Sequence, residues 1–418
     1  MADRLPQKVS RVEEAQRLSV EREVLRVYQE ENPSTRFLES EERLWEEERR
    51  RVLLFRDYLK LPPRLFRGAS LLDLGCGTGE HAIFYSRWGA DCTLVEMNPL
   101  ALERARKIFA LRAPQEARYR FVERSLFDYD PGEERFDIVA CEGVLHHTGA
   151  KEAGFEHLAS CLKPGGFLIL AICTRAGMFQ RDLQRLVIRA LAREEAEIPA
   201  LAERLFRENI DRAERFGRRS RAAIIQDTYV NPKIDCPCTG EVMAWFARSG
   251  LRVYSAWPPV MPAELVDPPI KGVMHQLAMD PAAAGGAELR WMTHRVDDAR
   301  SGEVWLERSR RLSALLEDLV RQTADVTASS RVDPGALAAA SERLLEGVRA
   351  GLGTFPQEDQ PEALLGEVLE LFEVLATGDV ERVESFLSAT RHLFRGANGV
   401  GLNFFVAYRE ESGSVATI

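Results

Sequence analysis

Five short apolar runs alternate with helical stretches between residues 70 and 173. The runs are residues 70–75, 91–97, 119–125, 136–143 and 166–173. Strand–helix–strand repetition with short links predicts right-handed crossovers and a parallel sheet that carries helices on both faces. Strands that are buried on both faces are almost wholly apolar, as these runs are. We therefore expect an α/β fold with a doubly wound sheet.

The alternation stops after residue 173, and an Arg-rich helical stretch follows over 176–222. A further helix is expected over 240–250 and a strand over 251–257. The apolar run 401–410 then stands alone after about a hundred helical residues, so it needs a partner strand. We expect it to return to the sheet as an antiparallel last strand beside 251–257. The prediction is a seven-stranded, mostly parallel sheet.

This reading divides the chain into four parts. They are an N-terminal helical arm over 1–60, a core over 61–262 with a helical lid at 176–222, a large all-helical insertion over 263–398 before the last strand, and the final strand with its tail over 399–418. In the arm, an apolar set is expected on one side of a helix that packs on the core. The set is Leu44, Leu53, Leu54, Phe55, Tyr58 and Leu59.

Composition narrows the classes of function. The 418 residues carry a formal net charge of −9, whereas proteins that hold long nucleic acids are normally basic, so nucleic acid is an unlikely partner without being excluded. No secretory signal and no apolar run of membrane-spanning length is found, which predicts a cytoplasmic protein without membrane association. Seven scattered cysteines suit a reducing compartment. Cys236 and Cys238 lack zinc-site spacing, so no metal is expected.

The segment from Asp73 to Gly79 follows the first predicted strand and opens a helix. Glycine at alternate positions lets the backbone turn sharply and lets a ligand lie against bare main chain. Glu96 follows at the tip of the second strand, where an acidic side chain can accept both hydroxyls of a ribose. A nucleoside-containing cofactor is indicated. A dinucleotide motif would need glycine at position 80, where this chain has Glu80.

The D-x-G-x-G-x-G spacing resembles the first motif of class I S-adenosylmethionine-dependent methyltransferases. Three further segments agree with that family in the same order: 95–99 after the second strand, 136–139 in the fourth, and 162–166 before the fifth. Over 50–260 the chain resembles a widespread group of these enzymes, and its His146-His147 pair resembles small-molecule methyltransferases of the ubiquinone-biosynthesis type. The resemblance implies a Rossmann-like seven-stranded fold, S-adenosylmethionine as cofactor, and methyl transfer.

The resemblance also implies a cofactor site. Glycines 75, 77 and 79 would hold the methionine end of the cofactor, Glu96 the ribose, and Met97 with Leu126 the adenine. The expected cofactor contacts are Asp73, Gly75, Cys76, Gly77, Gly79, Glu96, Met97, Ser125, Leu126, Glu142 and Gly143. Ser125 stands where the family often has aspartate, and Asp128 comes three residues late, so the partner of the adenine edge is left open.

Four residues are candidates on the acceptor side. His146 and His147 follow the fourth strand, where an imidazole could take a proton from a hydroxyl or amine acceptor, or could simply pack at a strand end. Asp227 and Tyr229 belong to a polar segment beside a proline turn, which is either part of an acceptor pocket or an ordinary loop. The Asn/Asp-Pro-Pro-aromatic motif of amino-directed nucleic-acid enzymes is absent.

Three functions stay open at this point. The first is methyl transfer to an oxygen, nitrogen or carbon atom of a small or medium-sized molecule. The second is modification of a structured RNA such as tRNA. The third is a non-catalytic scaffold that binds the cofactor and docks a partner through its helices. The insertion over 263–398 could also form a homodimer.

Overall fold

The structure is a computed structural model. It describes residues 11–30, 40–217, 220–230, 235–260, 361–395 and 401–411, with isolated positions between 288 and 346. Most of the predicted insertion over 263–398 lies outside these residues, and so do positions 231–234 and the tail from 412. Among the described residues, no helix is both long and apolar enough for a membrane span.

Seven strands form one sheet in the order β3-β2-β1-β4-β5-β7-β6. They are β1 (Ser70–Leu74), β2 (Asp91–Glu96), β3 (Tyr119–Glu123), β4 (Phe136–Glu142), β5 (Leu162–Cys173), β6 (Leu251–Trp257) and β7 (Leu402–Arg409). The first five pair in parallel, and β7 lies antiparallel between β5 and β6. The predicted seven-stranded sheet with its antiparallel last strand is confirmed.

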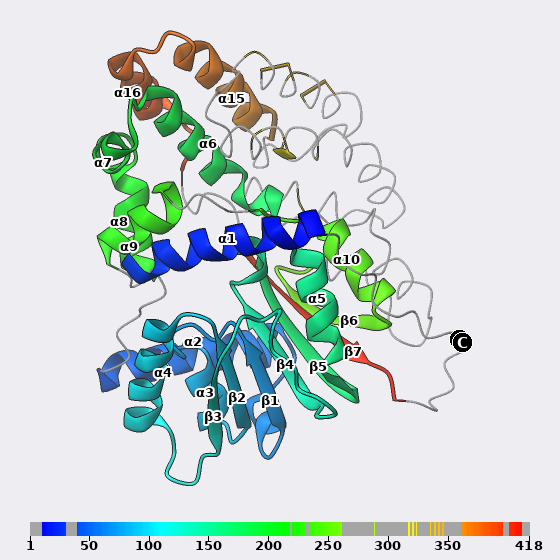
Figure 1. Cartoon of the computed structure of the whole chain (residues 1–418). Coiled ribbons are helices and arrows are strands. Elements are labelled where there is room, and N and C mark those ends of the chain that lie inside the picture. Colours follow the sequence, from blue (N-terminus) through cyan, green and yellow to red (C-terminus); the bar gives the residue numbers. More distant parts are fainter. Residues whose placement is uncertain are drawn as a thin grey trace.

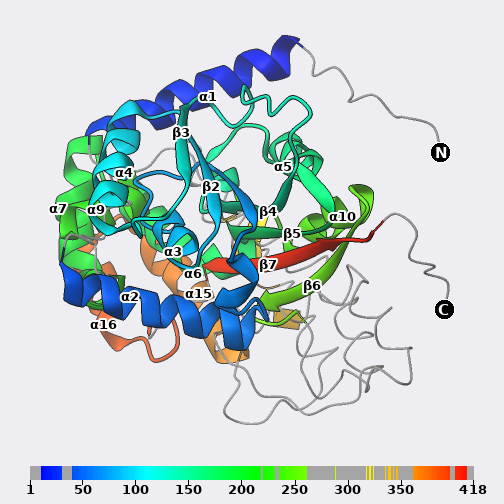
Figure 2. The same cartoon turned by 90° about the horizontal axis from the view of Figure 1, so that it is seen from below.

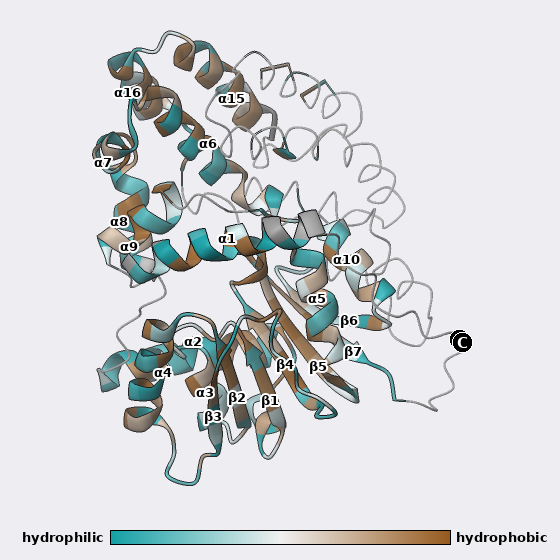
Figure 3. Cartoon of the chain, viewed as in Figure 1, coloured by the Kyte–Doolittle hydropathy of each residue, from teal (hydrophilic) through white to brown (hydrophobic). Residues whose placement is uncertain are grey.

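Side chains along each strand alternate between two apolar layers. In β1, Leu72 and Leu74 join one layer while Leu71 joins the other, as the two-residue period of a strand requires. In β7, Phe405 and Phe404 divide in the same way. Both faces of the sheet are therefore buried, which explains why its strands are among the most hydrophobic segments (Figure 3).

Helices cover the two faces (Figures 1 and 2). The helices and helical turns around the sheet are α1 (Arg11–Glu30), α2 (Glu41–Leu53), η1 (Leu54–Tyr58), η2 (Pro63–Phe66), α3 (Ala82–Arg87), α4 (Pro99–Arg112), η3 (Leu145–His147), α5 (Lys151–Ser160) and α10 (Thr239–Arg248). Buried residues of η1, η2, α3 and α4 pack on one face, and those of α5 and α10 on the other.

The N-terminal arm packs on the core as predicted, but two residues of its predicted apolar side are exposed. Phe55 and Leu59 are fully buried, but Leu53 and Tyr58 are 40% and 55% exposed. The cause is η1, a π-helical turn in which the Leu59 N–H bonds the Leu54 carbonyl at 2.9 Å. This wider turn moves Tyr58 out of the side that a regular 3.6-residue period gives it. Leu53 precedes the turn, and a regular helix already places it opposite Leu44, nine residues earlier.

A third layer of helices lies above the carboxyl ends of the strands (Figure 1). Its elements are α6 (Arg175–Leu191), η4 (Glu195–Glu197), α7 (Ile198–Leu205), α8 (Arg207–Gly217), α9 (Arg221–Ile225), η5 (Gln226–Val230), α15 (Pro361–Leu375) and α16 (Val380–Ala389). These helices share one apolar core. The predicted lid over 176–222 thus packs together with helices from the predicted insertion, and its action as a lid stays a prediction.

Candidate functional site

The glycine loop after β1 turns back against the end of β2. The backbone N–H groups of Gly75 and Cys76 both bond the Val95 carbonyl, at 2.9 and 3.0 Å. Gly75 has φ +83°, and a Cβ there would lie 2.6 Å from a methyl group of Val144. Gly77 has φ +53°, and a Cβ there would meet no atom within 4 Å. The loop therefore presents bare backbone with open space beside Gly77, as a bound ligand would need.

Glu96 ends β2 with its carboxylate directed at this loop. Its Oε2 accepts the N–H of Gly77 at 2.9 Å, and its Oε1 accepts the N–H of Asn98 at 2.8 Å. Burial raises the pKa of Glu96, while hydrogen bonds from the Asn98, Gly77 and Met97 backbone partly offset this. The structure therefore brings together the acid and the glycine loop, although Gly77 and Glu96 lie 19 residues apart in sequence.

A cavity of about 60 Å³ opens beside them. Its lining is formed by residues from four loops and from α1: Glu21, Val24, Gly75, Glu96, Met97, Arg124, Ser125, Leu126, Val144, His147 and Thr148. Five of the predicted cofactor contacts and one predicted acceptor-side histidine are in this set. A larger cavity of about 350 Å³ lies on the helical layer beside α8 and Phe394, and it shares no lining residue with this one. The smaller cavity is the candidate site because the motif residues converge on it.

The comparisons with known proteins address the same region. Residues 45–215 match a family model described as a methyltransferase domain. This stretch of the chain is therefore similar to a methyltransferase domain. The ubiquinone biosynthesis O-methyltransferase of Alkalilimnicola ehrlichii is 37% identical over 109 residues, which are 26% of this chain and 43% of that protein. The ribosomal RNA large subunit methyltransferase G of Shewanella amazonensis is 34% identical over 110 residues, which are 24% and 28%.

Solved structures are similar to parts of this chain. The 1,6-didemethyltoxoflavin-N1-methyltransferase of Burkholderia thailandensis is 28% identical, with a TM-score of 0.22 over 26% of this chain and 47% of that one. The chain spans less than half the length of the curated relatives named above. The matched methyltransferase domain begins within α2 and ends within α8, so α1 lies outside it.

Three of the predicted cofactor residues outside the cavity lining are Asp73, Cys76 and Gly143. Asp73 is 3% exposed, and burial together with the charge of Glu142 keeps its pKa well above the ordinary value. Burial likewise raises the pKa of the Cys76 thiol, which contacts the Gly77 carbonyl at 3.8 Å. Gly143 follows β4 with φ +77° and open space beside it. None of the three lines the cavity, and their cofactor contacts stay predictions.

Glu142 is committed to a buried charged cluster. Its carboxylate accepts hydrogen bonds from Arg51 of α2 and Tyr85 of α3, and His81 Nδ1 lies 3.4 Å from its second oxygen. Burial opposes ionisation of Glu142, but the charges of Arg51 and His81 outweigh it and lower its pKa to about 2. Both Arg51 and Glu142 are buried, with 7% and 2% of their side chains exposed. Glu142 thus anchors α2 to the end of β4.

The two histidines after β4 differ in their surroundings. His146 is 4% exposed, and its Nδ1 lies 3.4 Å from the N–H of Cys173. Burial opposes protonation of His146, but the neighbouring Cys173 and Asp227 raise its pKa overall. His147 lines the cavity, stands 4.2 Å from His146 between ring centres, and pairs with the Tyr28 hydroxyl at 3.3 Å. His147 is therefore the candidate that can meet an acceptor.

The structure separates Asp227 from Tyr229. Asp227 is half-buried in η5, and its charge acts on His146 and on Arg185. Tyr229 is 2% exposed, stacks on Phe206, and donates its hydroxyl to Gln184 at 3.1 Å. Tyr229 therefore packs within the helical layer away from the cavity, which favours a structural role over the predicted catalytic one.

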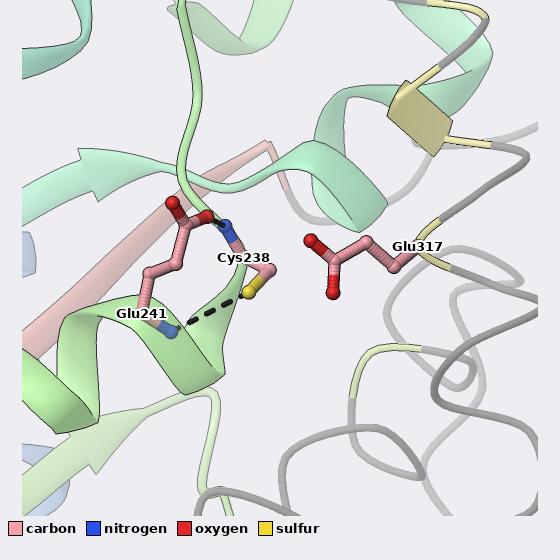
Figure 4. A group of neighbouring side chains, drawn as sticks. All are labelled: Cys238, Glu241 and Glu317. Carbon is pink, nitrogen blue, oxygen red and sulfur yellow. Dashed lines mark hydrogen bonds between the residues drawn. The ribbon is translucent and has the colours of Figure 1, made fainter.

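One group of described residues has donor spacing that would suit a metal ion. Cys238, Glu241 and Glu317 place their ligand atoms within 4.8 Å of one another (Figure 4). Cys238 caps α10 by accepting the Glu241 N–H at 3.4 Å, and Arg175 pairs with both carboxylates at 3.2 and 3.0 Å. Burial also raises the pKa of the Cys238 thiol, which disfavours the thiolate that a metal requires. Helix capping and ion pairing account for this cluster.

Sequence reasoning missed two sets of residues. Arg51 lies seven residues after Leu44 and four before Phe55, so it falls on the buried stripe of α2, and a charge on such a stripe signals a buried partner. Glu21 and Val24 line the cavity from α1, a charged helix whose sequence alone shows no sign of a ligand. Only the tertiary fold places them at the site.

Proposed function

We propose that this chain is an S-adenosylmethionine-dependent methyltransferase acting on a small or medium-sized acceptor. The observation that carries the proposal is the cavity shared by the glycine loop after β1 and the Glu96 carboxylate after β2, within a methyltransferase domain. The residues fit the cofactor, because Gly77 leaves space beside bare backbone and Glu96 offers a carboxylate for ribose hydroxyls. Met97 and Leu126 provide apolar surfaces for adenine.

Each residue then has a definite task. When bound, S-adenosylmethionine supplies a methyl group on a positively charged sulfur. The loop at Gly75 and Gly77 holds the methionine end in place, so the acceptor can attack in line with the carbon–sulfur bond. Transfer of this methyl group to an acceptor atom would leave the cofactor as a neutral thioether. His147, on the cavity wall, can take the proton from a hydroxyl or amine acceptor.

A small acceptor is favoured because Glu21 and Val24 of α1 form part of the cavity wall and the chain is acidic overall. With α1 in the closed position, a folded RNA would be kept from His147 by the helix. The curated relatives named above include both a ubiquinone-biosynthesis enzyme and a ribosomal RNA enzyme, so acceptor class must be tested directly.

Calorimetric titration of the purified chain with S-adenosylmethionine, S-adenosylhomocysteine and NAD tests the cofactor. We expect micromolar binding of both sulfur nucleosides and none of NAD. Incubation with methyl-labelled S-adenosylmethionine and either small-molecule extract or total tRNA and ribosomal RNA then tests the acceptor. Label in the small-molecule fraction supports the proposal, and label confined to RNA overturns the acceptor class. Binding without transfer to either fraction would indicate a scaffold.

A further inference from the structure

Helix α1 crosses above the ends of the strands that carry the cofactor motifs (Figure 1). The Tyr28 carbonyl accepts a hydrogen bond from Asn98 Nδ2 at 3.5 Å, after β2. The Tyr28 hydroxyl reaches His147 at 3.3 Å, after β4. The hydroxyl of Ser125, which follows β3, donates a hydrogen bond to the Glu21 carboxylate. One helix thus contacts the loops that follow β2, β3 and β4.

The contacts of α1 continue toward its N-terminal end. Arg17 lies over the ring of Phe127, with 4.8 Å between the guanidinium carbon and the ring centre, and its Nη2 is 3.9 Å from Asp128. At Gly149 the backbones approach closely, because a Cβ there would lie 3.3 Å from Arg17 Cα. Val24 is 7% exposed and faces the cavity. Helix α1 therefore packs on the core and lies over the cavity; we call α1 (Arg11–Glu30) the roof helix.

With the roof helix in this position, the cavity is too small for a nucleoside cofactor. The cavity measures about 60 Å³, whereas pockets that hold ligands of that class measure about 300–1,000 Å³. Glu21 and Val24 belong to the wall that limits it. Because Glu96 ends β2 and Gly75 and Leu126 follow β1 and β3 within three residues, we expect α1 to be the wall that moves when the cofactor enters.

The side chain that α1 places at the adenine end is Glu21. Its Oε1 lies 2.5 Å from Ser125 Oγ, and Arg17 holds its other oxygen at 3.3 Å. Ser125 and Leu126 are the residues expected beside adenine, so the carboxylate lies at the edge of the predicted adenine subsite. Among the described lining residues the other carboxylate is Glu96, whose oxygens already accept N–H groups from Gly77 and Asn98.

We propose that α1 opens and closes over the cofactor, and that Glu21 selects adenine by accepting a hydrogen bond from its exocyclic amino group. The inference rests on the proposed function. In the closed free protein the Ser125 hydroxyl occupies the acceptor atom of Glu21; in the complex the adenine amino group takes that hydrogen bond. A purine that has a carbonyl oxygen in place of the amino group would put a hydrogen-bond acceptor next to the Glu21 carboxylate. Two acceptors repel each other, so such a purine binds more weakly.

The experiment compares two nucleosides that differ at that position. S-adenosylhomocysteine carries an amino group, and S-inosylhomocysteine carries an oxygen. Calorimetric titration of the full-length chain is expected to favour the adenosyl compound by tenfold or more. In Glu21→Gln the adenosyl affinity should fall about tenfold and the preference should shrink, because an amide can also donate to the oxygen. The control is Glu23→Gln, an exposed residue on the same helix that should behave as wild type.

Movement of the roof helix can be measured separately from binding. Amide hydrogen exchange of residues 17–28 should slow when the chain is saturated with S-adenosylhomocysteine, because α1 opens less often in the complex. A Glu21→Gln variant that keeps the wild-type preference overturns the role of Glu21 while leaving the proposed function standing. A wild-type chain that binds neither nucleoside overturns both. Unchanged exchange in α1 overturns the opening and closing of the helix.

Discussion

Glu96 Oε2 accepts a hydrogen bond from the backbone N–H of Gly77 at 2.9 Å, so the acid after β2 and the glycine loop after β1 are joined before any ligand arrives. The second oxygen of Glu96 is held by Asn98 at 2.8 Å. The carboxylate is thus fixed in place, and its remaining lone pairs are available to ribose hydroxyls. Such preorganisation reduces the entropy that the site must lose on binding.

Two glycine substitutions should separate stability from binding. Gly77→Ala should cost about 1–2 kcal/mol of unfolding free energy, the penalty of a left-handed backbone, yet lower S-adenosylhomocysteine affinity at least tenfold because the methyl group fills the open space. Gly75→Ala should lose stability by a further ~1–3 kcal/mol, because its Cβ would lie 2.6 Å from Val144. Urea unfolding and calorimetric titration measure the two effects. Unaltered binding by folded Gly77→Ala would place the cofactor elsewhere.

The Arg51–Glu142 pair predicts how stability responds to acid. The pKa of Glu142 is about 2 in the folded chain and 4.5 as its ordinary value, so the unfolded state binds the extra proton between these values. The stabilisation is therefore complete above pH 4.5 and is lost as pH falls toward 2, by about 3 kcal/mol in all. Urea unfolding between pH 5 and pH 3 should show a shallower loss in Glu142→Gln than in wild type. Equal slopes would mean that Glu142 is not paired in solution.

Tyr229→Phe tests whether this residue has a catalytic or a packing role. Removing the hydroxyl leaves Gln184 without its 3.1 Å partner and should cost about 1 kcal/mol of stability. Because Tyr229 lies within the helical layer, methyl transfer by the folded variant should stay within about twofold of wild type. A loss of turnover much larger than the stability change explains would restore the catalytic role expected from the sequence.

Most of the fold was predicted from the alternation of short apolar runs with helical stretches. Strands that are buried on both faces of a parallel sheet are apolar, and helices connect them. The spacing from Gly75 to Glu96 likewise predicted that loop and acid would meet. The position of Glu21 could not be predicted, since it depends on α1 folding back over loops that lie 70 to 119 residues later in the chain. Tyr58 was misplaced because a π-helical turn follows no regular helical period. Local sequence patterns predicted the helices, the strands and the glycine loop. They did not predict contacts between elements that are far apart in the sequence.

The most direct test of the central claim is the affinity of Glu96→Ala for S-adenosylhomocysteine. We predict a loss of about 1–3 kcal/mol, roughly five- to hundredfold, because the ribose hydroxyls lose their acceptor. The matched control is Glu123→Ala, an exposed acid directly beside Glu96 on β3, which should bind as wild type does. Thermal unfolding confirms that both variants are folded. Wild-type affinity in folded Glu96→Ala would contradict the assigned cofactor site.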